Sequence, residues 1–507
     1  MMRKLLLLAF IISHFTVAAQ PLRTPAEIKN FAQPSSYEEI VKYIEQLDQS
    51  SDLVAVESIG KSVSGRNLFA LKFSKSGIRS NQPKIKVLIQ AQQHGNEQSG
   101  KEGALLLANE LVKPEYSYLF DRIDLLLVPQ VNPDGSEKNV RRNSNGADLN
   151  RNHVIMTEPE VMALHRLFDK YLFEVTMDVH EYYPYSEEWT NKGYSKNSDV
   201  LIGLNTNPQI PPLIRDLQKR EYMPFWAEYL KTRGVSNGTY SPGGPTEDTY
   251  VRYSTFDIND GRQSYGIQNT FSFIQEGLNG EDSFVQNLSH RAYSQSRGML
   301  ALLVFVYKNG KEMKKIVREE RKNLMSPPAN EDVALQMEHV ADGSILKLHV
   351  YSYYSKIDSI IEFKNFRPVV KPTLSVKKPF GYLIPASETE LVDWARRQGF
   401  EIKPLTNPGN LVFEKLVISA VDSIDFEGDI IPCPQVTTTV ISDNISPENF
   451  VFIPTAQLKG NLLVIAIEPQ SELGLATYSQ FGYLMKAQTV YPVIRVRKSE
   501  SKTLTIK

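Results

Sequence analysis

Two short segments of the sequence carry side chains that are typical metal ligands. His94 and Glu97 lie three residues apart in a polar loop, and His180 ends a segment with the pattern of a strand. Asp178 precedes His180 by two residues and therefore points to the same side of that strand. Two imidazoles and one carboxylate suit Zn²⁺ and would leave one coordination position open for water. A His-x-x-Glu pair alone is weak evidence, because such pairs occur by chance.

Two further segments place charge at predicted loops and strand ends. The segment 141–143 reads Arg-Arg-Asn, and 146–152 reads Gly-Ala-Asp-Leu-Asn-Arg-Asn. Arginine and asparagine donors suit a carboxylate, although a solvated basic loop is the alternative. Glu276 follows an otherwise apolar strand, where a carboxylate is costly unless it is solvated or paired. We therefore expect Glu276 to face a pocket.

Alternating strands and helices must position these side chains. The predicted strands are Leu53–Ile59, Asn67–Phe73, Ile85–Ala91, Ile123–Val128, Val175–Val179 and Asn269–Ile274. The predicted helices are Ser36–Leu47, which starts with a capping-box pattern, Gly103–Leu111, Pro159–Tyr171 and Val285–Lys308. This alternation indicates an α/β fold with a mixed, mostly parallel sheet flanked by helices, and ligands bind such sheets at the carboxyl ends of the strands.

The pattern changes after the charge-rich stretch 311–323 and the Ser-Pro-Pro at 326–328, which we interpret as the end of the first unit and a linker. Short β-like runs follow at Ile345–Tyr351, Leu411–Val417, Gln435–Val440 and Leu462–Ile467. One helix is predicted from a capping box at 387–390 to a point near Gly399. The predicted divisions are an N-terminal leader at 1–19, a first domain at 20–325 that carries the candidate ligands, and a β-rich α+β accessory region at 326–507.

The N-terminus has the order of a secretory signal peptide. A basic Arg3-Lys4 pair precedes the apolar run Leu5–Ile12, and Ala18-Ala19 fits a cleavage site before Gln20. We therefore expect a secreted or periplasmic mature protein. The later apolar run Met299–Tyr307 is too short to span a bilayer, so no stable membrane span is predicted.

Composition restricts the kind of site that this chain can build. Its 507 residues carry 57 Lys and Arg against 58 Asp and Glu, a balance that predicts no nucleic-acid footprint. The hydrophobic fraction of 41% excludes global disorder. Cys433 is the one cysteine, which excludes an intrachain disulfide and a multi-cysteine zinc site. A metal must therefore be held by carboxylates and by some of the eight histidines.

In their order along the chain, these segments resemble the zinc carboxypeptidase family, which includes carboxypeptidase A. The resemblance runs from about Tyr37 to Lys308 and includes the segment Ile59–Arg66, which is similar to the family's G-x-S-x-x-G-R turn. The order His-x-x-Glu, Arg, Asn-Arg, His, Glu is preserved. Five ordered pieces together are a specific signal, and they imply a zinc carboxypeptidase-like fold with one Zn²⁺ per chain.

The resemblance also assigns roles around the metal. It makes His94, Glu97 and His180 the zinc ligands. Asp148 resembles the carboxylate that orients a ligand imidazole. Arg141 resembles the arginine that polarises the scissile carbonyl and stabilises the oxyanion.

Further roles concern the substrate and proton transfer. Asn150 and Arg151 resemble the pair that binds the C-terminal carboxylate of a substrate, and Glu276 resembles the general base. His153 lies close to this pair in sequence and is a candidate for lining the cleft. The other histidines outside the ligand set and the leader are interpreted as packing or surface residues.

Some positions depart from the family pattern. Tyr253 is our candidate for the tyrosine that caps the substrate, with Tyr250 and Tyr265 as rivals. The spacing between the second and third ligands is shorter than in the animal digestive enzymes, so their side-chain specificity is not transferred. Glu181, next to the last ligand, is not the usual small polar residue and receives no role.

The C-terminal region resembles accessory segments of some bacterial family members at 378–385, 464–471 and 491–493, and we expect it to pack or to position substrate. The leading hypothesis is a secreted zinc metallocarboxypeptidase that hydrolyses C-terminal peptide bonds by zinc-activated water, with a glutamate as base. Its substrate would be a peptide or peptide-like molecule with a free carboxylate. The alternatives are a zinc amidase or peptidase acting on cell-wall peptides, and a non-catalytic binding module on the same fold.

Overall fold

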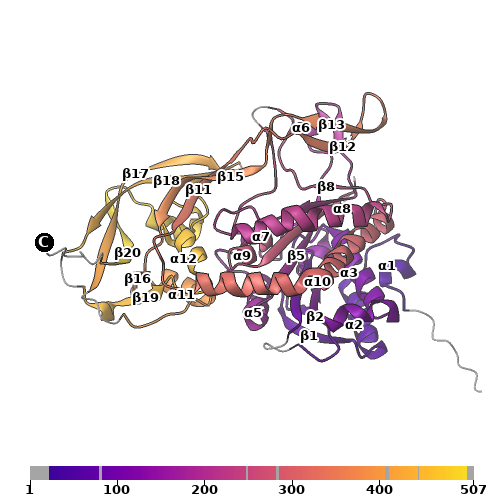
Figure 1. Cartoon of the computed structure of the whole chain (residues 1–507), viewed down its shortest axis with the longest axis horizontal. Helices are drawn as coiled ribbons and strands as arrows, with labels where there is room; N and C mark the ends of the chain where they lie inside the picture. Colours follow the sequence, from indigo (N-terminus) through magenta and orange to yellow (C-terminus); the bar gives the residue numbers. More distant parts are fainter. Residues whose placement is uncertain are drawn as a thin grey trace, which may run out of the picture.

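The computed structural model describes residues 22–78, 83–246, 249–280, 285–405, 410–426, 428–442 and 445–499. The predicted signal peptide at 1–19 lies outside the described residues. Figure 1 shows a large α/β unit and, beside it, a β-rich region formed by the C-terminal part of the chain. Among the described residues, no helix combines the length and the apolar character that crossing a bilayer requires.

An eight-stranded sheet forms the centre of the α/β unit. Its order is β1 (Val54–Lys61), β2 (Asn67–Phe73), β4 (Ile123–Val128), β3 (Ile85–Ala91), β5 (Val175–Tyr182), β10 (Phe271–Leu278), β7 (Val200–Gly203) and β8 (Asn237–Thr239). The pairs β4–β3, β3–β5, β5–β10 and β7–β8 are parallel, and the remaining pairs are antiparallel. The predicted fold class, a mixed and mainly parallel sheet flanked by helices, is confirmed.

Helices cover both faces of this sheet because its central strands are apolar on both sides. In β3, Val87 and Ile89 pack with α2 (Tyr37–Ser50), α3 (Gln98–Leu111), α8 (Met223–Lys231) and α10 (Leu288–Leu324). Leu88 points the other way and packs with α5 (Pro159–Tyr171). The capping box of α2 is confirmed, since the Ser36 amide donates to Glu39 and the Glu39 amide donates to Ser36 Oγ.

The shorter helices lie in the connections of this unit. They are α1 (Pro25–Ile28), α4 (Pro133–Lys138), α6 (Glu187–Thr190), α7 (Pro212–Leu217) and α9 (Gly261–Gly266). The segment after α7, η3 (Gln218–Tyr222), continues into α8.

The long helix α10 corrects one prediction. The stretch 311–323 is its C-terminal part, and it does not form a linker. Met313, Val317 and Arg321 recur every four residues and are buried, while the charges between them face outward. These three buried residues lie on one face of the helix, and the many charged residues between them made this pattern hard to recognise in the sequence. Figure 1 shows α10 running along the α/β unit with its C-terminal end next to the accessory region.

The C-terminal region contains a five-stranded sheet in the order β18 (Asp429–Val440), β17 (Leu411–Phe426), β20 (Thr489–Lys498), β16 (Gly381–Pro385) and β19 (Phe450–Pro454). The strands β11 (Asp332–Val340) and β15 (Val369–Lys377) form a separate pair. The helix α11 (Thr389–Arg397) confirms the predicted helix, but no side chain caps its N-terminus, so the predicted capping box is wrong.

The predicted strand at 462–467 is also wrong, because these residues form α12 (Gly460–Ile467). Every residue of α12 is buried. A helix without a polar face shows no 3.6-residue period, so a short apolar run cannot be told from a buried strand.

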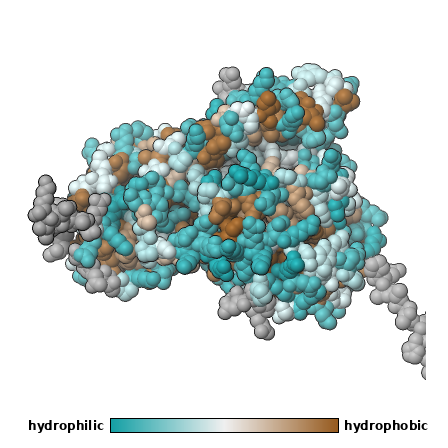
Figure 2. All heavy atoms as spheres, in the orientation of Figure 1, coloured by the Kyte–Doolittle hydropathy of each residue, from teal (hydrophilic) through white to brown (hydrophobic). Residues whose placement is uncertain are grey.

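The two regions share strands and core. Strand β6 (Tyr194–Lys196) belongs to the first unit and pairs with β12 (Leu346–Ser352) of the accessory region. Strand β12 also pairs with β13 (Ile357–Phe363). Likewise β9 (Val251–Arg252) pairs with β14 (Phe366–Arg367). Figure 2 shows apolar residues at the surface of the lobe that carries β12 and β13, where Ile357 and Ile360 are exposed. The domain boundary at residue 325 stays a prediction.

Candidate metal centre and active site

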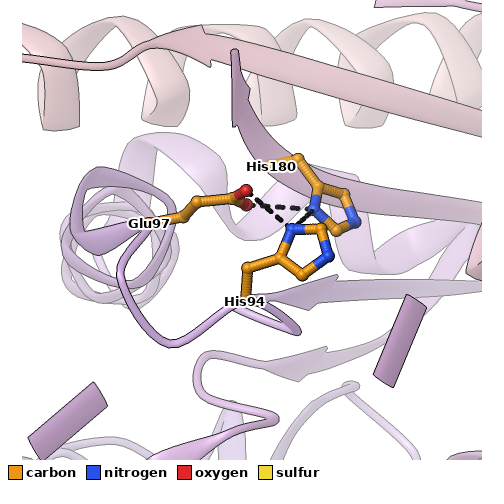
Figure 3. A group of neighbouring side chains, drawn as sticks. All are labelled: His94, Glu97 and His180. Atoms are coloured by element: carbon orange, nitrogen blue, oxygen red, sulfur yellow. Dashed lines mark hydrogen bonds and ion pairs between the residues drawn. The ribbon is translucent and has the colours of Figure 1, made fainter. Parts of the chain in front are cut away.

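The three predicted ligands meet at the carboxyl ends of neighbouring parallel strands. His94 follows β3, Glu97 stands at the N-cap of α3, and His180 lies in β5. His94 Nδ1 is 2.6 Å from Glu97 Oε1 and 3.1 Å from His180 Nδ1, which is 3.0 Å from Glu97 Oε2. Figure 3 shows the two imidazoles and the carboxylate directed toward one another. Their ligand atoms all lie within 4.8 Å of one another, so this group could hold a metal ion.

The outer nitrogens of both imidazoles face carboxylates. His94 Nε2 is 3.2 Å from Asp148 Oδ1, and His180 Nε2 is 3.0 Å from Asp178 Oδ2. An ionised carboxylate only accepts hydrogen bonds, so Asp148 and Asp178 suit an imidazole that keeps its proton on Nε2 when a metal ion takes the Nδ1 lone pair. Two lone pairs 3.1 Å apart, next to a carboxylate, are favourable when a cation lies between them. The residues therefore fit zinc, with each imidazole oriented by a carboxylate.

The electrostatics of the cluster favour positive charge. Burial would raise the pKa of Glu97, but His94 and His180 hold it well below its usual range. Burial likewise opposes ionisation of Asp148, yet His94 and the nearby Arg141 lower its pKa. Burial would lower the pKa of His180, and Asp178 together with Glu97 raises it well above its usual value. Buried carboxylates therefore dominate this site and attract a cation.

Glu276 lies beside the cluster on the neighbouring strand. In the parallel pair β5–β10 it is opposite His180, and both line a cavity of about 130 Å³. Burial raises the pKa of Glu276 to about 7, although His180 opposes the shift. A carboxyl group with a pKa near neutrality is suited to exchange protons during a reaction.

The predicted basic and amide residues lie around the same cavity. Arg141, Asn150 and Arg151 all line it. Arg141 Nε donates to Asp148 Oδ2 at 2.9 Å, and Arg141 NH1 is 3.2 Å from His94 Nδ1. Asn150 and Arg151 belong to a single 3-10 turn whose N-cap is Asp148, so one turn links the carboxylate beside His94 to both residues.

Tyr253 does not lie in this cavity. It lines a different cavity of about 360 Å³, together with Phe366 of the accessory region. The pairing of β9 with β14 holds Tyr253 there, since its amide donates to the carbonyl of Arg367 at 3.2 Å. The spacing to Glu276 suggested Tyr253 but could not reveal this pairing. Neither rival replaces it, because Tyr250 stacks on Arg367 and Tyr265 is buried against Phe168.

Sequence reasoning missed several residues that line or support the cavity. Tyr240, Thr255 and Asp260 line it, and no motif marked them. Glu181, which had no assigned role, contacts the amide of Ser99 at 3.1 Å and forms an ion pair with Arg291 at 2.7 Å. Glu181 thus connects β5 to α3 and α10. Asp178 was not missed, since the alternation of β5 predicts it on the same side as His180, and its Oδ2 lies 3.0 Å from His180 Nε2.

Comparisons with known proteins agree with this geometry. Residues 40–199 match the family model for zinc carboxypeptidases. The chain is 23% identical to carboxypeptidase 2 of Trichophyton rubrum over 479 residues, which cover 92% of this chain and 87% of that protein. It is 29% identical to carboxypeptidase D of Mus musculus over 248 residues, covering 41% of this chain and 17% of that protein.

A solved metallo-carboxypeptidase from Burkholderia cenocepacia aligns with a TM-score of 0.42 and 23% identity, over 54% of this chain and 70% of that one. The match of residues 40–199 spans all three candidate ligands, and the similarity to the fungal carboxypeptidase continues into the C-terminal region. Residues 40–199 thus match a zinc carboxypeptidase domain, and the protein is a peptide hydrolase.

Proposed function

We propose that this enzyme removes the C-terminal residue of peptides at the cavity lined by His94, Glu97, His180 and Glu276. The observation that carries the proposal is the convergence of the two Nδ1 atoms and the Glu97 carboxylate next to Glu276. One zinc ion per chain, held by those three ligands, would polarise the scissile carbonyl and acidify the attacking water.

Glu276 is the proposed general base. It removes a proton from the water as the water oxygen attacks the carbonyl carbon, and it passes this proton to the amine when the C–N bond breaks. Its support is a buried position opposite His180 and a pKa raised toward neutrality by burial. Arg141, which is held by Asp148, is proposed to stabilise the negative charge on the carbonyl oxygen.

Asn150 and Arg151 are the proposed binding pair for the substrate's terminal carboxylate. An amide and a guanidinium on one short turn offer several N–H donors to an anion. Tyr240 is our candidate for an aromatic contact with the substrate, because it lines the cavity and Tyr253 does not. We also propose that the mature enzyme is exported, on the basis of the basic and apolar residues at 3–12.

A matched pair of peptides tests the proposal. The peptides share one sequence and differ in a free or an amidated C-terminus, and product release is followed by mass spectrometry. We expect release of the C-terminal residue from the free peptide, a loss of at least tenfold in kcat/KM on amidation, and a much smaller amidation effect in Arg151→Ala. Equal cleavage of both peptides by the wild-type enzyme would contradict the proposed carboxylate clamp, which is the pair Asn150 and Arg151, and would favour an amidase or an endopeptidase.

A further inference from the structure

A buried glutamine, Gln93, connects the residues around the metal ligand His180 to the proposed carboxylate-binding residue Asn150. Gln93 has no solvent exposure and precedes the ligand His94. Its Nε2 donates to Asp178 Oδ2 at 2.6 Å and to Asn150 Oδ1 at 3.2 Å, and its Oε1 lies 2.9 Å from His153 Nε2. One side-chain amide therefore touches the carboxylate behind His180 and the amide of the proposed clamp.

The orientation of the Gln93 amide follows from its partners. The Asp178 carboxylate can only accept, so the NH₂ group of Gln93 must face it and the oxygen must face His153. His153 Nε2 is then the donor, and its Nδ1 accepts from His165 Nε2 at 2.9 Å. Burial lowers the pKa of His153 to about 4, so at neutral pH its ring carries the single proton that this arrangement requires.

The hydrogen bonds thus run in one direction. His165 donates to His153, His153 donates to Gln93, and Gln93 donates to Asp178. Asp178 Oδ2 also lies 3.0 Å from His180 Nε2, and an Nε2 proton facing this carboxylate would leave the His180 Nδ1 lone pair for the metal. Reversing any of these groups would place two acceptors or two donors face to face.

The same amide sets the orientation of Asn150. Asn150 Oδ1 accepts from Gln93 Nε2 at 3.2 Å and from the amide of Gly261 at 2.7 Å. With its oxygen satisfied by two donors, the NH₂ group of Asn150 is the part available to an anion in the cavity. A Cβ at Gly261 would overlap Asp178 Oδ2 and Gln93 Nε2, so the close approach of α9 requires glycine.

We propose that Gln93 is a positioning residue that orients both the zinc ligand His180, through Asp178, and the carboxylate-binding Asn150, and so couples metal binding to recognition of the substrate's C-terminus. The inference rests on the proposed roles of His180 and Asn150. It predicts that one substitution, remote from the substrate, impairs two separable properties.

The test compares Gln93→Met with Gln218→Met as a matched control. Gln218 is also fully buried and makes two hydrogen bonds, to the amide of Asn205 and the carbonyl of Ser272, but it touches neither Asp178 nor Asn150. Zinc affinity is measured by competition with a chelator, and KM and kcat are measured at saturating zinc with the free-carboxylate peptide. Gln93→Met is expected to weaken zinc binding roughly tenfold to a hundredfold and to raise KM about fivefold to tenfold. Gln218→Met should change neither.

Double variants separate the two effects. The KM effect of Gln93→Met should disappear in an Asn150→Ala background, and its zinc effect should disappear in an Asp178→Asn background. If Gln93→Met does not fold, Gln93→Glu is measured in its place. It keeps the shape of the side chain and the oxygen that faces His153, but it replaces the NH₂ donor to Asp178 and Asn150 with an acceptor oxygen.

Wild-type KM and zinc affinity in a folded Gln93 variant would overturn the inference, as would additive effects in both double variants. If Asn150→Ala alone leaves KM unchanged, the clamp itself is wrong and the inference falls with it. If Asn150→Ala raises KM and Gln93→Met does not, only the role of Gln93 is wrong.

Discussion

At the scale of single residues, burial and neighbouring charges give the carboxylates of the site different pKa values. Glu97 is held ionised by two imidazoles, whereas burial raises the pKa of Glu276 to about 7. Asp148 and Asp178 are engaged with imidazole Nε2 atoms. The contacts of these carboxylates thus differ in the way that the proposed roles of ligand, base and orienting group require.

The first prediction concerns Glu276→Gln. The amide keeps the shape of the side chain but cannot accept the proton, so kcat should fall by roughly 10²-fold to 10⁴-fold, the usual contribution of a general base. Zinc affinity should stay within a few-fold of wild type, because Glu276 is not among the three proposed ligands. Steady-state kinetics and chelator competition on the same preparation measure both. An active Glu276→Gln enzyme would exclude this residue as the base.

The second prediction is a pH dependence. The base must be ionised to accept a proton, so kcat/KM should rise with pH through the pKa of Glu276 and then level off. Burial raises this pKa from 4.5 to about 7, and a nearby metal cation lowers it again. We therefore expect the acid limb between these two values. A profile that is flat from pH 4.5 to 8 would be incompatible with Glu276 as the base.

At the scale of elements, the loop between β3 and α3 must hold two ligands against the segment that follows β4. A Cβ at Gly95 would overlap the backbone of Gly135 and Ser136 in α4. The Gly95 amide also donates to the carbonyl of Arg141 at 3.2 Å. The position of His94 and Glu97 thus depends on a close approach that any side chain at residue 95 disrupts.

The third prediction follows from this packing. Gly95→Ala should cost about 1–3 kcal/mol of unfolding free energy by overpacking and should weaken zinc binding at least tenfold. Gly482→Ala is the control, because no atom lies within 4 Å of its added Cβ. Denaturant unfolding and zinc competition measure both effects. Unchanged zinc affinity in Gly95→Ala would show that the loop tolerates the displacement.

The elements also show how far the sequence could predict this protein. Strands such as Ile85–Ala91 and Ile123–Val128 were predicted with their observed bounds, because both runs have the length of a strand and turn or loop residues follow them. The ligands His94, Glu97 and His180 were predicted by type and order, and the structure brings them together.

Other features depended on contacts that no local pattern records. α12 was predicted as a strand because its burial on every side removed the helical period. Tyr253 is held away from the cavity by pairing with a strand more than a hundred residues later. Gln93 gave no signal at all, since a glutamine in a loop is ordinary until its three partners are known.

At the scale of the whole molecule, the accessory region holds the segment that follows the proposed clamp. Trp394 Nε1 donates to the carbonyl of Val154 at 2.8 Å, and Gln398 Nε2 donates to the carbonyls of His153 and Val154. Tyr478 Oη donates to the carbonyl of Arg151 at 3.2 Å. The C-terminal region thus contacts the backbone of residues 151–154, which supports a role in holding the segment next to the cavity in place.

The fourth prediction is that the two regions unfold together. Trp394 is fully buried in a core that includes Val154, Phe256 and Ile258 of the first unit. Trp394→Ala should cost about 3–5 kcal/mol through the cavity it leaves, and peptidase activity should be lost at the same denaturant concentration as secondary structure. Trp394→Phe, which fills most of the volume, should cost less. Activity that survives a first unfolding transition would show that the catalytic unit is independent of the accessory region.

The central claim is that zinc held by His94, Glu97 and His180 drives hydrolysis at the C-terminus of a peptide. The most direct measurement is a titration of metal-depleted protein with Zn²⁺, in which bound metal and hydrolysis of the free-carboxylate peptide are followed in the same sample. The account predicts activity that rises in proportion to bound zinc and reaches its limit at one zinc per chain. Full activity in the metal-depleted protein, or zinc binding that leaves the protein inactive, would contradict it.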